Sequence, residues 1–162
     1  MLSTLESLPE NARVWIYQSN TKLTDEQVTK ATQDLTSFLE AWTAHGAALK
    51  AAFEVKYNRF ITIALDQSQA AASGCSIDSQ VRFIQSLQAE LNVDLLDKMN
   101  VTYYQNDRIH YKPLTDFKKM VKNGAVGKNT IVFNNLVTNL GEYREHWEVP
   151  AKDSWHSRFL RK

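Results

Sequence analysis

The stretch LKAAFEVKYNRFITIALDQ, residues 49–67, predicts a β-hairpin, and its pairing decides the fold. A three-residue loop at 57–59 produces three apolar cross-strand pairs: Val55 with Ile61, Phe53 with Ile63, and Ala51 with Leu65. These six side chains then share one face, because side chains alternate along a strand. A two-residue loop would set Glu54 opposite Ile61 and mix the faces. The pattern therefore favours the three-residue loop.

The clearest helix signal precedes the hairpin, in LTDEQVTKATQDLTSFLEAWTAHG at 23–46. Thr24 suits the N-cap with Gln27 as its capping-box partner, and Leu23 and Val28 suit a hydrophobic staple. Apolar residues then recur on one face at helical spacing: Val28, Ala31, Leu35, Phe38, Leu39 and Trp42. We expect Gly46 to end this helix in a left-handed conformation, directly after His45.

Further elements surround this pair. Residues 12–17 predict a strand with Val14 and Ile16 on one face and Trp15 and Tyr17 on the other. Residues 77–91 predict a second amphipathic helix, and 101–104 and 108–111 predict two short strands around a turn at 105–107. The inward residues of that second helix are expected to be Val81, Ile84 and Leu87.

The resulting order, β-α-β-β-α-β, is typical of a ferredoxin-like sandwich. The last third adds a Lys-rich helix near 115–122, a strand at 130–134 and an irregular aromatic tail. No linker, repeat or low-complexity segment interrupts the chain. We therefore expect one α+β domain over residues 1–162, with a C-terminal strand and helix extension.

The composition is that of an ordinary globular protein. The chain is 43% hydrophobic and 23% charged, with a net charge of +1 that indicates no global attraction to nucleic acid or anionic membranes. One cysteine excludes an internal disulfide and a cysteine-based zinc site. No membrane-spanning or leader segment is apparent, so a cytoplasmic location is expected.

Two stretches imitate nucleotide-binding motifs. NGAVGKNT at 123–130 contains Gly127 and Lys128, but Lys122 stands where a Walker A loop needs glycine, and Asn129 stands where it needs a hydroxyl. A strand rather than a helix is expected to follow, so no helix N-terminus would face a phosphate. ITIALDQ at 61–67 ends in Asp66, but no phosphate loop precedes it. Nucleotide hydrolysis is not expected.

Four stretches together resemble an uncharacterised family of bacterial proteins of about this length: HGAALKAAFEVKYNRF, SGCSIDSQVRFI, TIVFNNLV and WEVPAKDSWHSRF. Members often carry the label "ABC transporter ATPase". That label implies a Walker A loop, a signature motif and a Walker B strand, in that order, and none is intact in this sequence. The resemblance implies no catalytic residues.

The only cysteine, Cys75, lies in SGCSIDS at 73–79. A helix N-terminus stabilises a thiolate and offers backbone N–H groups to an oxyanion, so Cys75 is a candidate nucleophile with His45 as a candidate base. The structural alternative makes Ser76 the N-cap, places Asp78 in the first turn and packs Cys75 just before them. The alternative is preferred because a carboxylate there opposes thiolate formation.

No metal site is expected. The four histidines are scattered, and His146 and His156 are ten residues apart in the tail, which fixes no coordination geometry. We expect the neighbouring Trp147 and Trp155 to anchor the tail while both histidines lie at its polar rim.

Nucleic-acid binding is a weaker alternative. Residues 101–130 hold six Lys and Arg against two Asp and Glu. Trp15, Tyr17 and Phe60 would form an open aromatic face of the sheet, on which bases could stack. The preferred interpretation is that Trp147, Trp155 and Phe133 cover Trp15 and Tyr17, and a protein-partner surface is the second.

The absence of a complete catalytic set favours a small non-catalytic binding or scaffold protein, without cofactor, whose partner is a protein or a small molecule. A Cys75-dependent enzyme is the alternative. Binding of single-stranded RNA on the sheet face is the third.

Overall fold

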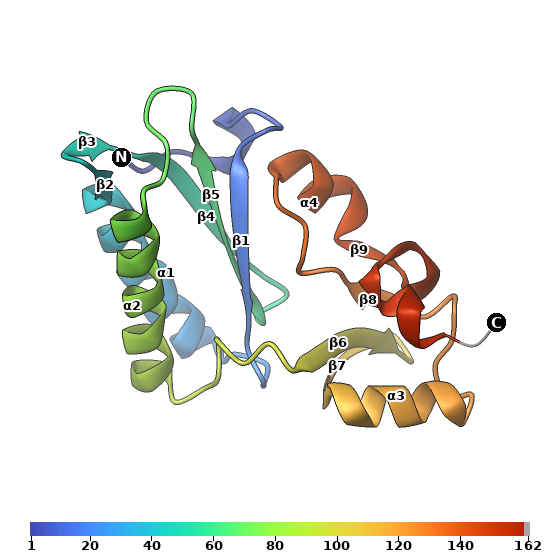
Figure 1. Cartoon of the computed structure of the whole chain (residues 1–162). Coiled ribbons are helices and arrows are strands. Elements are labelled where there is room, and N and C mark those ends of the chain that lie inside the picture. Colours follow the sequence, from blue (N-terminus) through green and yellow to red (C-terminus); the bar gives the residue numbers. More distant parts are fainter. Residues whose placement is uncertain (161–162) are drawn as a thin grey trace. The chain divides into compact units, whose positions relative to one another are not determined.

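A computed structural model describes residues 1–160 (Figure 1). The chain forms two compact units. Met1–Leu96 and Thr138–Gly141 make up the first, and Asp97–Val137 and the residues from Glu142 onward make up the second. The α+β class is confirmed, since helices and antiparallel sheets both occur. One domain over residues 1–162 stays a prediction, because two compact units can belong to one domain.

The sheet of the first unit has three antiparallel strands in the order β1-β5-β4. Their bounds are Arg13–Gln18 for β1, Lys50–Lys56 for β4 and Phe60–Asp66 for β5. The predicted hairpin register is confirmed, because β4 and β5 pair Val55 with Ile61, Phe53 with Ile63 and Ala51 with Leu65. The tight loop needs residues with positive φ, and Tyr57 and Asn58 adopt this conformation although neither is glycine.

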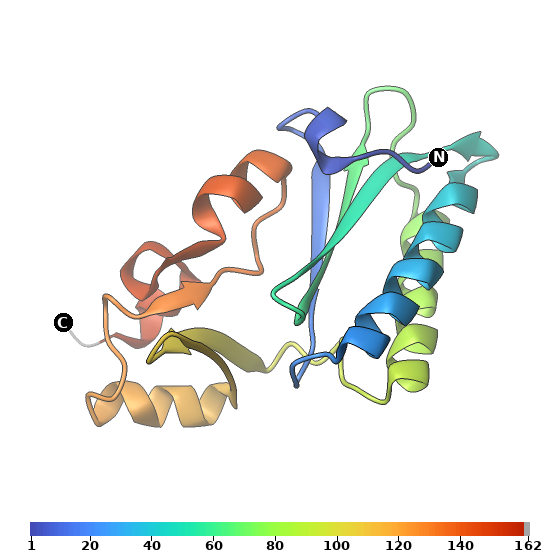
Figure 2. The ribbon, with the colours of Figure 1, turned by 180° about the vertical axis from the view of Figure 1, so that it is seen from behind.

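Helices α1 (Asp25–Ala41) and α2 (Gly74–Leu91) lie side by side on one face of this sheet (Figure 2). They bury the apolar face that the hairpin register creates. The fully buried members of this core are Ala31, Leu35, Leu39, Leu49, Ala51, Ile61, Ile63, Leu65 and Ile84. Burial of an aliphatic side chain contributes roughly 1.5–3 kcal/mol, so this layer contributes strongly to the stability of the first unit.

Helix α1 begins as the sequence predicts. Thr24 Oγ1 accepts a hydrogen bond from the Gln27 amide at 3.1 Å, and Gln27 Oε1 accepts one from the Thr24 amide at 2.8 Å. This capping box satisfies two backbone donors at the helix start. Gln27 Nε2 also donates to the Leu91 carbonyl at 2.9 Å, so the same side chain joins the start of α1 to the end of α2.

The predicted end of α1 is wrong. The helix stops at Ala41, and a short antiparallel ladder of β2 (Thr43–Ala44) with β3 (Ala47–Ala48) follows. His45 and Gly46 form the turn between them, with φ of 51° and 79°. A helix stop and a tight hairpin turn both need a left-handed residue, which is why the glycine alone does not distinguish them.

The predicted ferredoxin-like topology is not confirmed. The strand after α2, β6 (Asn100–Gln105), pairs with β7 and β8 in the sheet of the second unit. Residues 138–140 lie beside β1 instead. There the Val14 amide donates to the Thr138 carbonyl at 3.0 Å, and the Leu140 amide donates to the Ala12 carbonyl at 2.9 Å.

The sheet of the second unit has the order β7-β6-β8-β9. The remaining strands are β7 (Arg108–Pro113), β8 (Ile131–Phe133) and β9 (Glu148–Pro150), and the remaining helices are α3 (Leu114–Lys122) and α4 (Leu140–His146). Short 3₁₀ turns lie at Leu5–Ser7, Ala151–Asp153 and Trp155–Phe159. The turn between β6 and β7 has two residues, Asn106 and Asp107, rather than the predicted three, and both have positive φ.

Helix α3 packs on β6, where its Phe117 and Val121 join Val101 and Tyr103 in a separate buried core. The predicted Lys-rich helix therefore packs its apolar side against the core of the second unit. Among residues 1–160, no helix is both long and apolar enough to cross a membrane.

Candidate functional site

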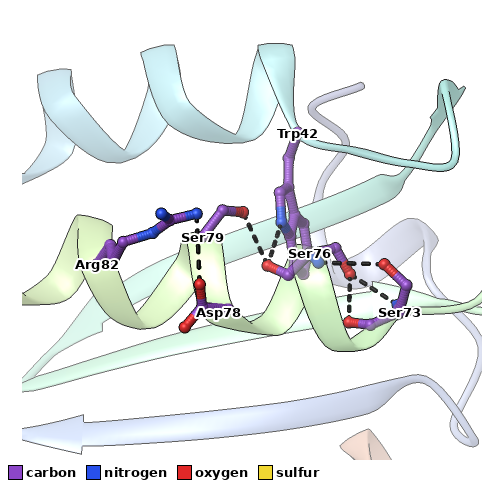
Figure 3. A network of polar contacts seen from close by, with 6 residues as sticks. All are labelled: Trp42, Ser73, Ser76, Asp78, Ser79 and Arg82. Atoms are coloured by element: carbon purple, nitrogen blue, oxygen red, sulfur yellow. Dashed lines mark hydrogen bonds and ion pairs between the residues drawn. The ribbon is translucent and has the colours of Figure 1, made fainter.

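Helix α2 starts three residues before its predicted start. The roles predicted for Cys75, Ser76 and Asp78 therefore change. Ser73, not Ser76, is the N-cap: its hydroxyl accepts from the Ser76 amide at 3.1 Å, and Ser76 Oγ accepts from the Ser73 amide at 2.7 Å (Figure 3). Ser76 is the buried third residue of this capping box. Two serines at this spacing were a usable signal, because a serine can replace the usual Glu or Gln.

Asp78 consequently lies outside the first turn of α2. Its carboxylate is exposed and forms an ion pair with Arg82 at 3.3 Å, one turn further along the helix (Figure 3). The expected interaction between Asp78 and the helix N-terminus is therefore wrong. An exposed pair of this kind stabilises a helix by about 0.3–0.5 kcal/mol.

Cys75 is the second residue of α2 and is exposed. The expectation that it packs against the body of the protein is wrong. His45 lies in the β2–β3 turn, and β2 contacts α2. Within residues 1–160, no hydrogen bond joins Cys75 to His45, so the nucleophile–base contact that catalysis would need is not formed.

The aromatic platform expected for RNA is not formed. Trp15 and Tyr17 pair with Ile63 and Ile61, so they lie on the face that the helices cover. Phe60 is adjacent to Ile61 on β5 and therefore points to the opposite face, where it is fully buried. The prediction that these three rings share one open face is wrong.

Tyr17 instead forms a polar pair inside the core. Its hydroxyl donates to Gln80 Oε1 at 2.6 Å, and both side chains are buried. Burial raises the pKa of Tyr17 to about 12, because it disfavours the phenolate. Gln80 Nε2 has no hydrogen-bond partner among the described residues. The pair ties β1 to α2.

Trp15 packs edge-on against Trp42, with ring centres 6.0 Å apart, and the Arg13 guanidinium lies 4.7 Å from the Trp15 ring centre. Trp42 donates its indole N–H to the Ser76 carbonyl at 2.9 Å (Figure 3). The prediction that Trp147, Trp155 and Phe133 would cover Trp15 and Tyr17 is wrong, since α1 and α2 do so.

Those three residues pack within the second unit. Trp147 contacts Phe133 with ring centres 4.9 Å apart, and Trp155 stacks on His156 at 3.9 Å. His156 is buried rather than at a polar rim, and a 2.6 Å hydrogen bond joins its Nδ1 to Ser154 Oγ. Burial lowers the pKa of His156 to about 4. His146 is exposed, as predicted.

The loop that imitates a Walker A motif has a structural role. The Gly127 amide donates to Thr130 Oγ1 at 2.9 Å, and β8 follows directly. The element that follows Lys128 is a strand rather than a helix, so the geometry of a phosphate loop is not formed there. Within the described part of the chain, no group of three or more His, Cys, Asp or Glu residues is placed to hold a metal ion.

A surface groove lies between α1 and α2. Phe38 and Phe83 stack there with ring centres 4.5 Å apart and planes 12° apart, and Leu87 continues the apolar floor. The rim carries Asp34, Ser37, Ser86 and Glu90, and the hollow has a volume of about 410 Å³. We call this hollow the α1–α2 groove.

A second hollow of about 350 Å³ lies along the first half of α1 and includes Asp25, Glu26, Thr29, Lys30 and Gln33. Lys30 connects it to the α1–α2 groove, because its ammonium lies 3.1 Å from Asp34 and 3.4 Å from Glu90. Hydrogen bonds from Lys30 to these carboxylates, Asp34 first, raise its pKa.

The sequence reasoning missed this groove. It placed Phe38 on the inward face of α1 and assigned no role to Phe83. A usable signal was the position of Phe83 next to Ile84, since adjacent helical residues lie about 100° apart and Phe83 is therefore at the margin of the buried face. The pairing of Phe83 with Phe38 depends on how the helices pack, which no local pattern shows.

The comparisons with known proteins found no counterpart: no family model, no curated protein and no solved structure matches the chain.

Proposed function

We propose that this chain is a non-catalytic binding module that engages a partner through the α1–α2 groove. The observation that carries the proposal is the stacked pair Phe38 and Phe83, which is only partly buried although both rings are large and apolar. Aromatic residues at the floor of a polar-rimmed hollow are typical of residues that dominate binding energy at interfaces.

Cys75 supplies the alternative, an enzyme with a thiol nucleophile. Its exposure at the start of α2 favours access by a substrate. Catalysis also needs a base within hydrogen-bond reach, and among the described residues no hydrogen bond joins Cys75 to a histidine. We therefore rank binding above catalysis. RNA binding on the Trp15 and Tyr17 face is not proposed, since that face is covered.

Site-specific photo-crosslinking in the cells from which the protein derives tests the binding proposal. A benzophenone amino acid replaces Ser86, which lines the groove, or Gln85, which is its exposed neighbour outside the groove. We expect discrete covalent adducts from position 86 that are absent or much weaker from position 85. The Cys75→Ser variant should keep the adducts. Loss of adducts in that variant would favour the thiol alternative, and no adduct specific to position 86 would overturn the proposal.

A further inference from the structure

We infer that the occupant of the α1–α2 groove is an amphipathic helical segment of a partner protein that carries Lys or Arg beside its apolar residues. The inference rests on the proposed binding function and names the chemistry of the partner. Three features of the first unit carry it: the apolar floor, the length of the depression and the charge around it.

The floor requires apolar contact. Phe38 and Phe83 present their stacked rings, and Leu87 lies one turn after Phe83 on α2. Ser37 and Ser86 also line the groove, and their small side chains leave room above the rings. A partner residue such as Leu or Phe can enter this space and remove apolar surface from water.

The length suits a helix. The two hollows meet at Lys30 and together follow α1 from Asp25 to Phe38. Thirteen helical steps correspond to roughly 20 Å. A partner helix of about four turns lying along α1 would span this distance, with apolar side chains at i, i+4 and i+7 over the rings.

The charges of the residues that line the two hollows indicate the charge of the partner. The residues that line the two hollows include four carboxylates, Asp25, Glu26, Asp34 and Glu90, against one ammonium, Lys30. Asp25 and Glu26 also lie in the first turn of α1, where the helix dipole favours them. Asp34 and Glu90 share the single ammonium of Lys30, and they flank the apolar floor. A partner with cations at its rim complements this surface, whereas an acidic partner is repelled.

The ion pairs of Lys30 leave acceptor positions on Glu90 for such cations. Its one ammonium is shared between Asp34 and Glu90, and the Glu90 side chain is 53% exposed. A carboxylate has about four acceptor positions, so a guanidinium from the partner can bind Glu90 beside Lys30. Arg82, the one Lys or Arg of α2, is already paired with Asp78.

Three synthetic peptides of 14 residues test the inference with the full chain. The first is helical with Leu at i, i+4 and i+7 and Lys or Arg at its flanks. The second replaces every cation by Glu, and the third has the composition of the first in an order without amphipathic spacing. We expect saturable binding of the first peptide, measured by fluorescence anisotropy, at least about tenfold tighter than either other peptide and weaker as salt increases.

Variants locate the binding. Ser86→Arg places a bulky cation in the groove at an exposed helical position and should weaken binding of the first peptide by about tenfold or more. Asp34→Asn should weaken it by about twofold to fivefold, the range for an exposed charge pair. Glu40→Gln is the matched control, since Glu40 is an exposed α1 carboxylate that lines neither hollow, and affinity should stay unchanged.

Several results would overturn the inference. Equal binding of the first and third peptides would indicate charge without groove recognition, and stronger binding of the acidic peptide would indicate the wrong sign. Self-association in analytical ultracentrifugation that Ser86→Arg abolishes would assign the groove to a second copy. Sequencing of the adducts formed at position 86 separates this inference from the proposed function. Adducts on segments without excess Lys or Arg overturn only the partner class, whereas absence of adducts overturns the binding function itself.

Discussion

At the scale of single residues, the pair of Tyr17 and Gln80 is a polar contact inside an apolar core. Each side chain depends on the other, because Gln80 Oε1 accepts from Tyr17 and Gln80 Nε2 has no partner among the described residues. Burying an amide without hydrogen bonds is costly, so the pair disfavours alternative positions of α2 on the sheet.

Tyr17→Phe should therefore destabilise the protein by about 1–3 kcal/mol, since it leaves the Gln80 amide wholly unsatisfied. Gln80→Met should likewise cost stability by stranding the Tyr17 hydroxyl. The double variant should lose less than the sum of the two, which urea unfolding of the four proteins measures as a double-mutant cycle. Strict additivity would show that the hydrogen bond contributes no coupling.

His156 adds a pH dependence. Burial lowers its pKa from 6.5 to about 4, so the folded protein takes up its proton at lower pH than the unfolded chain does. The stability that depends on neutral His156 is thus complete above pH 6.5 and is lost progressively as the pH falls from 6.5 to 4. Between pH 7.5 and pH 5 this loss amounts to about 2 kcal/mol.

Urea unfolding at the two pH values should show this loss in the wild type and in His146→Gln, because His146 is exposed. It should shrink in His156→Gln, whose side chain does not titrate. An equal pH dependence in all three proteins would mean that His156 is not the responsible group.

At the scale of elements, the capping box of α2 links the sequence SGCSIDS to the position of a whole helix. The Ser73 hydroxyl accepts from the Ser76 amide, and the Ser76 carbonyl accepts from the Trp42 indole. Because Ser76 joins both contacts, the start of α2 is tied to the end of α1.

Ser73→Ala should lower the free energy of unfolding by about 1 kcal/mol, the usual cost of losing an N-cap acceptor. Ser73→Asp should retain most of the stability, since aspartate also caps well and lies favourably at the helix N-terminus. Thermal unfolding compares the three proteins. A decrease as large in Ser73→Asp as in Ser73→Ala would contradict the capping role.

Elements also show what the sequence can predict. The Thr24–Gln27 capping box and the β4–β5 register are local, since neighbouring residues determine them, and both are confirmed. The partner of β6 and the covering of Trp15 and Tyr17 depend on which distant surfaces meet, and those predictions failed. The α1–α2 groove belongs to the second kind, because it exists only once two helices pack together.

At the scale of the whole molecule, the first unit is not continuous along the chain. Its β1 strand has one edge paired with β5 and the other beside residues 138–140. Thr138 and Leu140 supply one acceptor and one donor to Val14 and Ala12, so a segment more than a hundred residues later completes the edge of the first strand. An open strand edge leaves backbone groups unpaired and promotes association between chains.

A fragment that ends at Leu96 should therefore expose this edge. We expect hydrogen exchange of the Val14 amide to accelerate in the fragment relative to the full chain by more than exchange of the amides of central strand β5, because Val14 loses its acceptor while β5 keeps both neighbours. Joining residues 136–143 to the fragment through a flexible Gly-Ser linker should restore the protection of Val14. Uniform acceleration across β1 and β5, unchanged by the added segment, would show that residues 138–140 are not required to complete the first unit.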